Sequence, residues 1–258
     1  HIAAEIAEQQ IGKVTGIPDE KAIAVWNTLP RRRKVSLRLN ENVLLPPGIL
    51  VQRNADGGCI SGPVDLPPCG YRVFRGEKAE PVPTQNLSGV EVIDMPFYHI
   101  TCSVTMCKII GILDKKTGEE LIDRQAPYGL GDFIYLYAEN KNLPQHHCDT
   151  AIPVDFRIER GPHAVIITKT AYERQVCAEV CCKFIFYEKE RNIDVELSFQ
   201  NATGLMGDFY DRYKKNIFFA FPFRVTSPRF FTELALGVVD EEKDRLPAYP
   251  RDFVVANN

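Results

Sequence analysis

The chain has 258 residues, of which 45% are hydrophobic and 25% charged, and this composition is typical of a soluble globular protein. Its formal net charge of −3 provides no general attraction to nucleic acid or to an anionic membrane. Since no apolar run approaches the roughly 20 residues that a transmembrane helix requires, we expect neither a nucleic-acid partner nor a membrane partner.

The beginning of the chain carries the one convincing helical pattern. Ile2, Ala3 and Ile6 are spaced for one helix face, and Gly12 is placed to end the helix. The sequence starts at His1 and not at a methionine. We therefore interpret residues 1–16 as the end of a helical segment in a processed or excised chain.

From Lys21 onward the residue pattern predicts an all-β fold. Short apolar runs between turn signals such as Asp56-Gly57-Gly58 predict a small β-sandwich domain over residues 17–78. A sandwich of roughly 60 residues has little core of its own, so we expect it to lean on something larger. Its expected strands are Ala22–Trp26, Val35–Leu39, Ile49–Gln52 and Tyr71–Phe74.

A linker is predicted over residues 79–88, because the segment Arg75–Gly89 is polar, lacks periodicity and contains Gly76, Pro81 and Pro83. A large β-supersandwich domain is expected over residues 89–258. A turn at Asp114–Gly118 should place Gly118 at positive φ. The expected strands of this domain are Tyr98–Lys108 running on into Ile109–Leu113, then Glu119–Asp123, Asp132–Ala138, Ala164–Thr170, Gln175–Tyr187 and Ile193–Phe199.

The segment Ile217–Phe223 has four phenylalanines in seven residues. A run that apolar is typical of a strand with both faces covered, so we expect it well inside a large sheet. Pro222 has no N–H to donate and is expected to bend or end that strand.

The eight cysteines are not placed like a disulfide framework. In the strand expected up to Tyr187, Cys177 and Cys181 share a face about 13 Å apart, which is too far for a bridge. Cys102 falls on the apolar face of its expected strand, in register with Met106. This placement favours a reducing compartment, with a lean toward the cytoplasm.

Two glycosylation acceptor patterns favour the opposite compartment. They are Asn86-Leu87-Ser88 and Asn201-Ala202-Thr203, and glycosylated asparagines belong to secreted proteins. Three-residue patterns of this kind are common by chance, so the cysteine placement decides the interpretation.

The densest group of potential metal ligands is Gln145–Asp149. His147 and Asp149 would point to the same side of an extended chain and could reach one ion. The segment is polar, follows Pro144 and has no strand periodicity, and no third ligand stands at a suitable spacing. We interpret it as a polar loop and expect no metal site here.

Four residues are candidates for carbohydrate contact. Tyr135, Tyr137 and Tyr210 flank loops and could stack on sugar rings, and Asp208 precedes the aromatic strand. The alternative is that the tyrosines belong to the core and that Asp208 merely solvates its loop. The basic run Arg31–Lys34 lacks interleaved aromatic residues and is interpreted as a solvated loop.

Four segments resemble family-38 glycoside hydrolases, the α-mannosidases. Val25–Pro30 resembles the start of the first β domain of that family, and Leu66–Phe74 resembles the end of the same domain. Ile112–Leu121 is similar to the hairpin that opens the family's large β-sandwich. Asn216–Pro247, with its Phe-Pro-Phe, Gly-Val-Val and Arg-Leu-Pro segments, resembles the family's most specific block.

The resemblance implies a non-catalytic portion of an enzyme acting on α-mannosides. In that family, zinc and a nucleophilic aspartate belong to an N-terminal α/β domain followed by a helical bundle, and neither domain matches this chain. No catalytic residue and no cofactor is therefore carried over, and the expected partners are the missing catalytic and helical domains and their α-mannoside. The family's sandwich also continues beyond the equivalent of Val254–Ala256, so we expect this one to be truncated.

Two other functions stay open. A free-standing carbohydrate-binding module would need an exposed aromatic platform. A sugar epimerase with the same sandwich fold would need a histidine facing a carboxylate, and His163 with Glu196 or Asp194 is the pairing that residue type permits.

Overall fold

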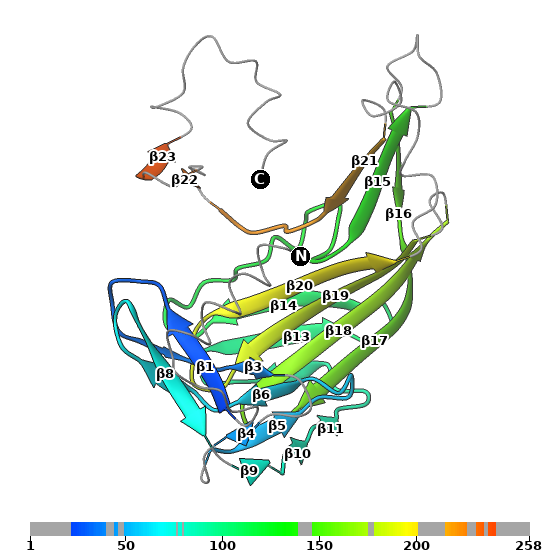
Figure 1. Ribbon diagram of the computed structural model, residues 1–258. Coiled ribbons are helices and arrows are strands. Elements are labelled where there is room, and N and C mark those ends of the chain that lie inside the picture. Colours follow the sequence, from blue (N-terminus) through cyan, green and yellow to red (C-terminus); the bar gives the residue numbers. More distant parts are fainter. Residues whose placement is uncertain are drawn as a thin grey trace. The chain divides into compact units, whose positions relative to one another are not determined.

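The computed structural model of the chain is built from β-strands (Figure 1). All regular elements in the part of the chain that it describes are strands, so the expected all-β class is confirmed, while the predicted helix within residues 1–16 lies outside that part. The chain divides into two compact units, His1–Pro222 and Phe223–Asn258. The described residues are 22–39, 44–45, 49–75, 77–78, 80–138, 146–174, 178–200, 215–225, 231–234 and 237–240.

The first strands form a small sandwich around its own core. β1 (Ala22–Asn27) pairs with β8 (Gly70–Arg75), β2 (Arg33–Val35) with β7 (Val64–Leu66), and β4 (Leu44–Leu45) with β9 (Glu77–Lys78). A four-stranded sheet has the order β10 (Val82–Pro83), β5 (Val51–Arg53), β6 (Cys59–Ser61) and β3 (Arg38–Leu39). The buried core consists of Leu37, Val51, Cys59, Val64, Leu66 and Phe74.

The predicted strand Val35–Leu39 is divided into β2 and β3. The Ser36 N–H donates to Glu190 Oε1 at 2.6 Å instead of to a neighbouring strand. The Leu37 N–H donates to the Ser61 hydroxyl at 3.2 Å. These two contacts bend the chain between the β2–β7 pair and the four-stranded sheet. One continuous apolar run therefore contributes a strand to each of them.

A five-stranded sheet forms the middle layer of the first unit. Its order is β11 (Gln85–Asn86), β17 (Ile152–Arg160), β18 (Ala164–Glu173), β19 (Ala178–Tyr187) and β20 (Ile193–Gln200), with every pair antiparallel. The strands expected at 164–170 and 193–199 are confirmed, and the one expected at 175–187 is confirmed from Ala178 onward, since residues 175–177 lie outside the described part. β17 was not predicted, because its mixed exposure gives no clean alternation.

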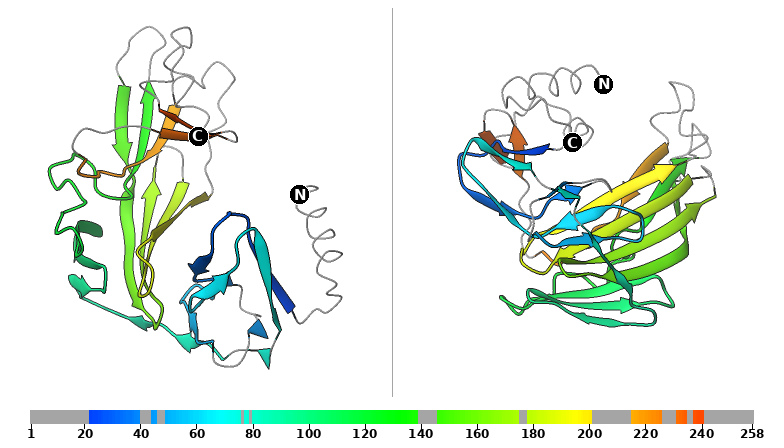
Figure 2. Two further views of the ribbon diagram at one scale, coloured as in Figure 1. Left: turned by 90° about the vertical axis from the view of Figure 1, so that its left-hand side faces the viewer. Right: turned by 60° about the horizontal axis from the view of Figure 1, so that its bottom comes forward.

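Both faces of this sheet are covered over part of their area (Figure 2), while Val154 of β17 and Phe199 of β20 stay 67% and 48% exposed. The inner face packs on a three-stranded sheet of β12 (Val92–Asp94), β13 (Tyr98–Ser103) and β14 (Lys108–Asp114). The outer face packs on the small sandwich through Ile60. The small sandwich therefore does lean on a larger partner, as its size requires.

The predicted linker contributes short strands to both neighbours. β10 pairs in parallel with β5 of the small sandwich, and β11 pairs with β17 of the large sheet. Both strands lie inside the first compact unit. The domain limits at 79–88 stay a prediction.

The predicted strand Tyr98–Lys108 is wrong in one respect, because it is two strands joined by a turn. The Met106 N–H donates to the Ser103 hydroxyl at 3.3 Å, and Cys107 has a φ of 51°. Cys102 is buried as expected, whereas Met106 is 54% exposed in the turn. The alternation of apolar residues continued through the turn and concealed it.

The segment after β14 agrees with the sequence only in part. Gly118 has a φ of 74°, as the turn chemistry predicted. The expected strand Glu119–Asp123 is reduced to two isolated bridge residues, Glu120, which pairs with Leu113, and Ile122.

The prediction that Ile217–Phe223 is covered on both faces is wrong. β21 (Lys215–Phe219) pairs with β15 (Phe133–Ala138), whose other neighbour is β16 (His146–Thr150). Within the described residues β21 stands at the edge of this sheet. Phe218 and Phe221 are 46% and 37% exposed, while Phe219 contacts Phe133 at 5.4 Å between ring centroids. The strand ends before Pro222.

In the second unit, β22 (Phe231–Leu234) pairs with β23 (Gly237–Asp240).

The cysteines whose side chains the structure describes are free: Cys59, Cys69, Cys102, Cys107, Cys181 and Cys182. Cys182 faces the inner core and Cys181 the opposite face. Burial raises the pKa of the Cys102 and Cys182 thiols to about 12. Both therefore act as small core hydrophobes.

One buried amide connects the small sandwich to the middle sheet. Gln52 of β5 is fully buried, and its Oε1 accepts from the His163 N–H at 3.0 Å and from the Ala164 N–H at 2.9 Å. A Cβ at Gly161 would overlap the Gln52 side chain, so the turn between β17 and β18 needs glycine there. The His163 Nε2 also lies 2.7 Å from the Leu50 carbonyl oxygen.

Replacing this amide should destabilise the first unit. In Gln52→Ala two buried N–H groups lose their acceptor, and each such loss costs about 1–3 kcal/mol. We expect the free energy of unfolding, measured by urea denaturation, to fall by about 2–4 kcal/mol. Gln125→Ala removes an exposed glutamine and should stay within about 0.5 kcal/mol of the parent; equal stability of the two variants would contradict the role of Gln52.

His163 should make stability depend on pH. Burial lowers the pKa of His163, and nearby Lys189 lowers it further, although the contact with the Leu50 carbonyl opposes both. The unfolded state thus binds a proton near pH 6.5 and the folded state only at lower pH, so stability falls as pH drops below about 6.5. His163→Gln should flatten the stability profile between about pH 7 and 5, and His99→Gln should retain the fall seen in the parent.

Candidate functional site

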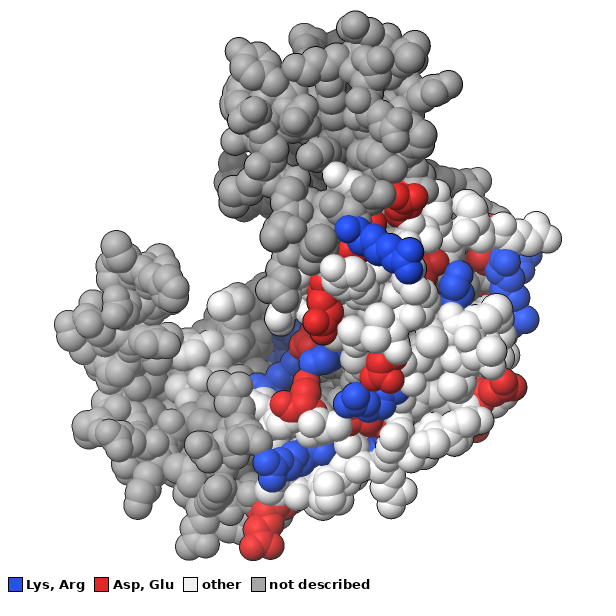
Figure 3. All heavy atoms as spheres, turned by 90° about the vertical axis from the view of Figure 1, so that its right-hand side faces the viewer, with Lys and Arg blue, Asp and Glu red and all other residues white. Residues whose placement is uncertain are grey.

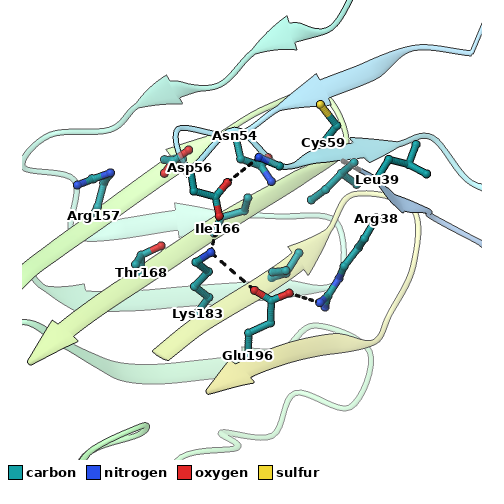
Figure 4. A pocket seen from close by; sticks show the side chains of 14 residues that line it. Arg38, Leu39, Asn54, Asp56, Cys59, Arg157, Ile166, Thr168, Lys183 and Glu196 are labelled. Carbon is teal, nitrogen blue, oxygen red and sulfur yellow. Dashed lines mark hydrogen bonds and ion pairs between the residues drawn. The ribbon is translucent and has the colours of Figure 1, made fainter. Parts of the chain in front are cut away.

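A cavity of about 240 Å³ lies between the small sandwich and the outer face of the middle sheet (Figure 4). β3 and the β5–β6 hairpin form one wall, and β17 to β20 form the floor. We call this cavity the interlayer cleft. Its charged lining consists of Arg38, Asp56, Arg157, Glu159, Lys183 and Glu196.

Lys183 is the central cation of the interlayer cleft. It projects from the outer face of β19, and its Nζ contacts the Asp56 carboxylate and lies 3.8 Å from Glu196 Oε2. Burial lowers the pKa of Lys183, but the hydrogen bond to Asp56 and the charge of Glu196 outweigh burial and raise it. Burial likewise raises the pKa of Asp56, and hydrogen bonds from Lys183 and the Gly58 N–H outweigh it, so that this pKa is lowered.

Arg38 forms the second cationic centre. Its guanidinium contacts Glu196, and its Nη2 lies 2.6 Å from Asp194 Oδ2. Tyr187 donates to the same Asp194 oxygen at 2.8 Å. Burial, reinforced by Asp194, raises the pKa of Tyr187 to about 12. Burial also acts to raise the pKa of Asp194, but hydrogen bonds from Tyr187 and Arg38 outweigh it and lower the pKa.

A buried carboxylate holds the hairpin above the sheet. Glu159 of β17 is 5% exposed, and its Oε2 accepts from the Ala55 N–H and from the Thr84 hydroxyl, both at 2.8 Å. The contact fixes the residue next to Asp56. The hairpin wall of the cleft is therefore positioned from below by the sheet itself.

The deeper part of the cleft combines an apolar surface with unused polar groups. Ile60, Ile166 and Ile185 are buried together under the charged rim. Asn54 Oδ1 accepts from Gln52 at 3.0 Å, whereas the Asn54 Nδ2 has no hydrogen-bond partner among the described residues. Within the same part of the chain the Thr168 hydroxyl is also without a partner.

The electrostatics of the interlayer cleft favour binding over proton transfer. Its three cationic and three anionic side chains balance, and acidic and basic side chains also lie side by side on the face shown in Figure 3. Asp56 and Asp194, with lowered pKa values, stay ionised at neutral pH. A general acid or base works best with a pKa near the operating pH, so neither carboxylate is suited to that task.

A second charged group lies on the inner side of the middle sheet and has a structural role. Lys169 is 5% exposed and contacts the Asp132 carboxylate, which also accepts from the Gly129 N–H at 2.7 Å. Burial acts to raise the pKa of Asp132, but Lys169 and Gly129 outweigh it and lower the pKa. The pair fixes the start of β15 against β18.

The structure describes two of the four predicted sugar contacts, Tyr135 and Tyr137. Tyr135 is 3% exposed in β15 and presents no ring to solvent. Tyr137 lies in the same strand, opposite His147 of β16. Asp208 and Tyr210 lie outside the described residues. The role of all four as sugar contacts stays a prediction.

The other sequence candidates are placed as follows. The segment around His147 and Asp149 is a strand, β16, so its interpretation as a loop is wrong; pairing with β15 supplied the order that its polar residues did not signal. His163 contacts the Leu50 carbonyl, whereas Asp194 and Glu196 both bind Arg38. The epimerase pairing therefore has no contact to support it.

Five of the six charged residues of the interlayer cleft, all except Glu196, were missed by reasoning from the sequence. Arg38, Asp56 and Lys183 lie on separate elements, and Asp56 had been recognised only as part of a turn. A weak signal did exist, since Lys183 and Glu196 lie on two strands that were predicted one after the other in the chain. Nothing in the sequence indicated which segment would cover those faces.

Comparisons with known proteins identify no relative. The sequence matches no protein-family model, and no curated protein matches it either. Within the described ranges no helix is long and apolar enough to cross a membrane. Among the same residues, no three His, Cys, Asp or Glu side chains are grouped so that they could hold a metal ion.

Acid should weaken the ion pairs of the interlayer cleft. Because the folded pKa values of Asp56 and Asp194 lie below the ordinary 3.8, their stabilisation is present above about pH 4 and is lost as pH falls through the folded values. Lys183→Met removes the partner of Asp56 and should lose less stability between about pH 7 and 3 than the parent does. Lys116→Met, at an exposed turn, should follow the parent; parallel profiles for all three proteins would contradict the prediction.

Proposed function

We propose that this chain is the non-catalytic β-sandwich portion of an α-mannosidase-like glycoside hydrolase acting on α-mannosides. One observation supports the proposal above all others. A small sandwich precedes a larger, layered β region and packs on its outer face through Ile60 and Gln52. This is the order of domains that the resemblance implies.

The segments that carry the resemblance also contact one another. Asn27 is 3% exposed, and its Nδ2 donates to the carbonyls of Arg31 and Pro67, each at 2.7 Å. Trp26 stands opposite Tyr71 in the β1–β8 pair, with ring centroids 4.5 Å apart. The first two segments of the resemblance therefore form one structural unit, which explains why they would occur together.

The third segment is fixed in a similar way. Asp114 is 6% exposed, accepts from the Lys116 N–H at 2.9 Å, and contacts the Arg191 guanidinium. Burial acts to raise the pKa of Asp114, but the Lys116 N–H and Arg191 outweigh it and lower the pKa. The hairpin is thereby attached to the loop between β19 and β20, which suits a scaffold.

In this proposal the β region supports a catalytic domain that lies outside the chain. The retaining chemistry, with a carboxylate nucleophile, a second carboxylic acid and zinc, would belong to that domain. The partners of this chain would be the catalytic and helical domains of the same enzyme. Its own contribution would be to hold their shape and to lend a wall to the sugar site.

The purified 258-residue chain should not cleave an aryl α-mannoside, with or without added zinc. A chromogenic assay with saturating substrate measures this directly. Zinc-dependent turnover that follows the chain through purification would contradict the proposal. The residues encoded upstream of His1 provide a second test, since a His-x-Asp pattern on a strand, far ahead of β1, is expected.

A further inference from the structure

We propose that the interlayer cleft binds a single neutral sugar ring. This function goes beyond the scaffold role and does not depend on it. The cavity of about 240 Å³ is smaller than the roughly 300–1,000 Å³ of drug-sized sites. It therefore suits one small ring better than an extended chain of sugars.

The charges of the interlayer cleft select against ions. An anion in the interlayer cleft would be repelled by Asp56 and Glu196, and a cation would be repelled by Lys183 and Arg38. These groups already neutralise one another through direct contacts. An ion or a zwitterion would have to break those pairs, whereas a neutral ligand leaves them intact.

A hydroxyl group can bind to the hydrogen-bond donors and acceptors that the paired charged side chains leave unused. It can donate one hydrogen bond and accept others, so it fits beside a cation and a carboxylate at the same time. Lys183 has three N–H donors and two carboxylate neighbours. One donor is used by Asp56, and Glu196 Oε2 at 3.8 Å is beyond hydrogen-bond distance, so Lys183 can still donate to a hydroxyl, and such charge-assisted hydrogen bonds are the stronger ones.

Two neutral groups extend the polar side of the site. The Asn54 amide nitrogen and the Thr168 hydroxyl line the interlayer cleft and lack partners within the described part of the chain. They lie on different sides of the cleft, Asn54 on the hairpin wall and Thr168 on β18 in the floor. Adjacent hydroxyls of one ring could therefore be bound from the wall and from the floor.

The buried isoleucines complete the match to a sugar. A pyranose ring carries C–H groups as well as hydroxyls, and it needs an apolar surface for them. Ile60, Ile166 and Ile185 line the cavity with the small apolar surface that their exposure of 1%, 3% and 4% leaves. A fully polar ligand such as inorganic phosphate would leave this part of the site without a contact.

The test is methyl-detected NMR on the full chain, titrated with methyl α-mannopyranoside, methyl α-glucopyranoside and inorganic phosphate. We expect a saturable shift of the Ile60, Ile166 and Ile185 methyl signals, with a dissociation constant on the order of millimolar for at least one glycoside. The signals of Ile100 and Ile112 on the far side of the sheet should stay unchanged. No saturable shift with either glycoside at about 50 mM would overturn the proposal.

Two variants place the ligand within the cleft. Thr168→Val removes one hydroxyl at constant shape and should weaken binding about fivefold, and Lys183→Met should weaken it at least about tenfold. Thr170→Val changes the next residue on the same face, outside the cavity, and should bind like the parent. Unchanged affinity in both cleft variants would overturn the assignment, as would phosphate that binds more tightly than the glycosides.

Because an inactive chain can still bind sugar, this result is separate from the turnover assay. If the isoleucine methyl signals do not shift when a glycoside is added, the cleft proposal is refuted and the scaffold role is unaffected. Turnover of an aryl α-mannoside would refute the scaffold role and would leave the NMR result unaffected.

Discussion

The side-chain amide of Gln52 is the contact on which the layered arrangement depends. One oxygen accepts from two successive N–H groups where β18 begins, at a position where Gln52 has no solvent-exposed surface. Hydrogen bonds are directional, so this contact fixes the register of the small sandwich, which apolar packing by Ile60 alone would leave free to slide. The glycine at 161 permits that approach.

The interlayer cleft exists because two kinds of contact occupy different depths of the same interface. Isoleucines close the interior, and longer charged side chains span the wider gap around them. Charged side chains are strongly hydrated, so they pair across the gap without collapsing it. An interface of apolar residues throughout would bury more surface and would leave no cavity.

The sequence was informative where one strand reports on its own surroundings. Alternation located Ile193–Phe199, and turn chemistry placed Gly118 at positive φ. The prediction that Ile217–Phe223 is covered on both faces was wrong, because a run of phenylalanines does not indicate whether a neighbouring strand exists. The interlayer cleft could not be predicted at all, because Lys183 is 127 residues from Asp56 and Arg38 is 158 residues from Glu196. Such pairs are defined by topology and not by local pattern.

Those sequence separations also determine the order in which the first unit can be assembled. Hairpins such as β13–β14 and β18–β19 close short loops and can form early, while the contacts of Gln52 and Arg38 must wait until strands more than 100 residues away have been made. On a ribosome, the small sandwich would emerge long before the sheet that covers Ile60. During that interval its outer surface is an unprotected apolar patch, so the nascent chain is most exposed to aggregation before β18–β20 are complete.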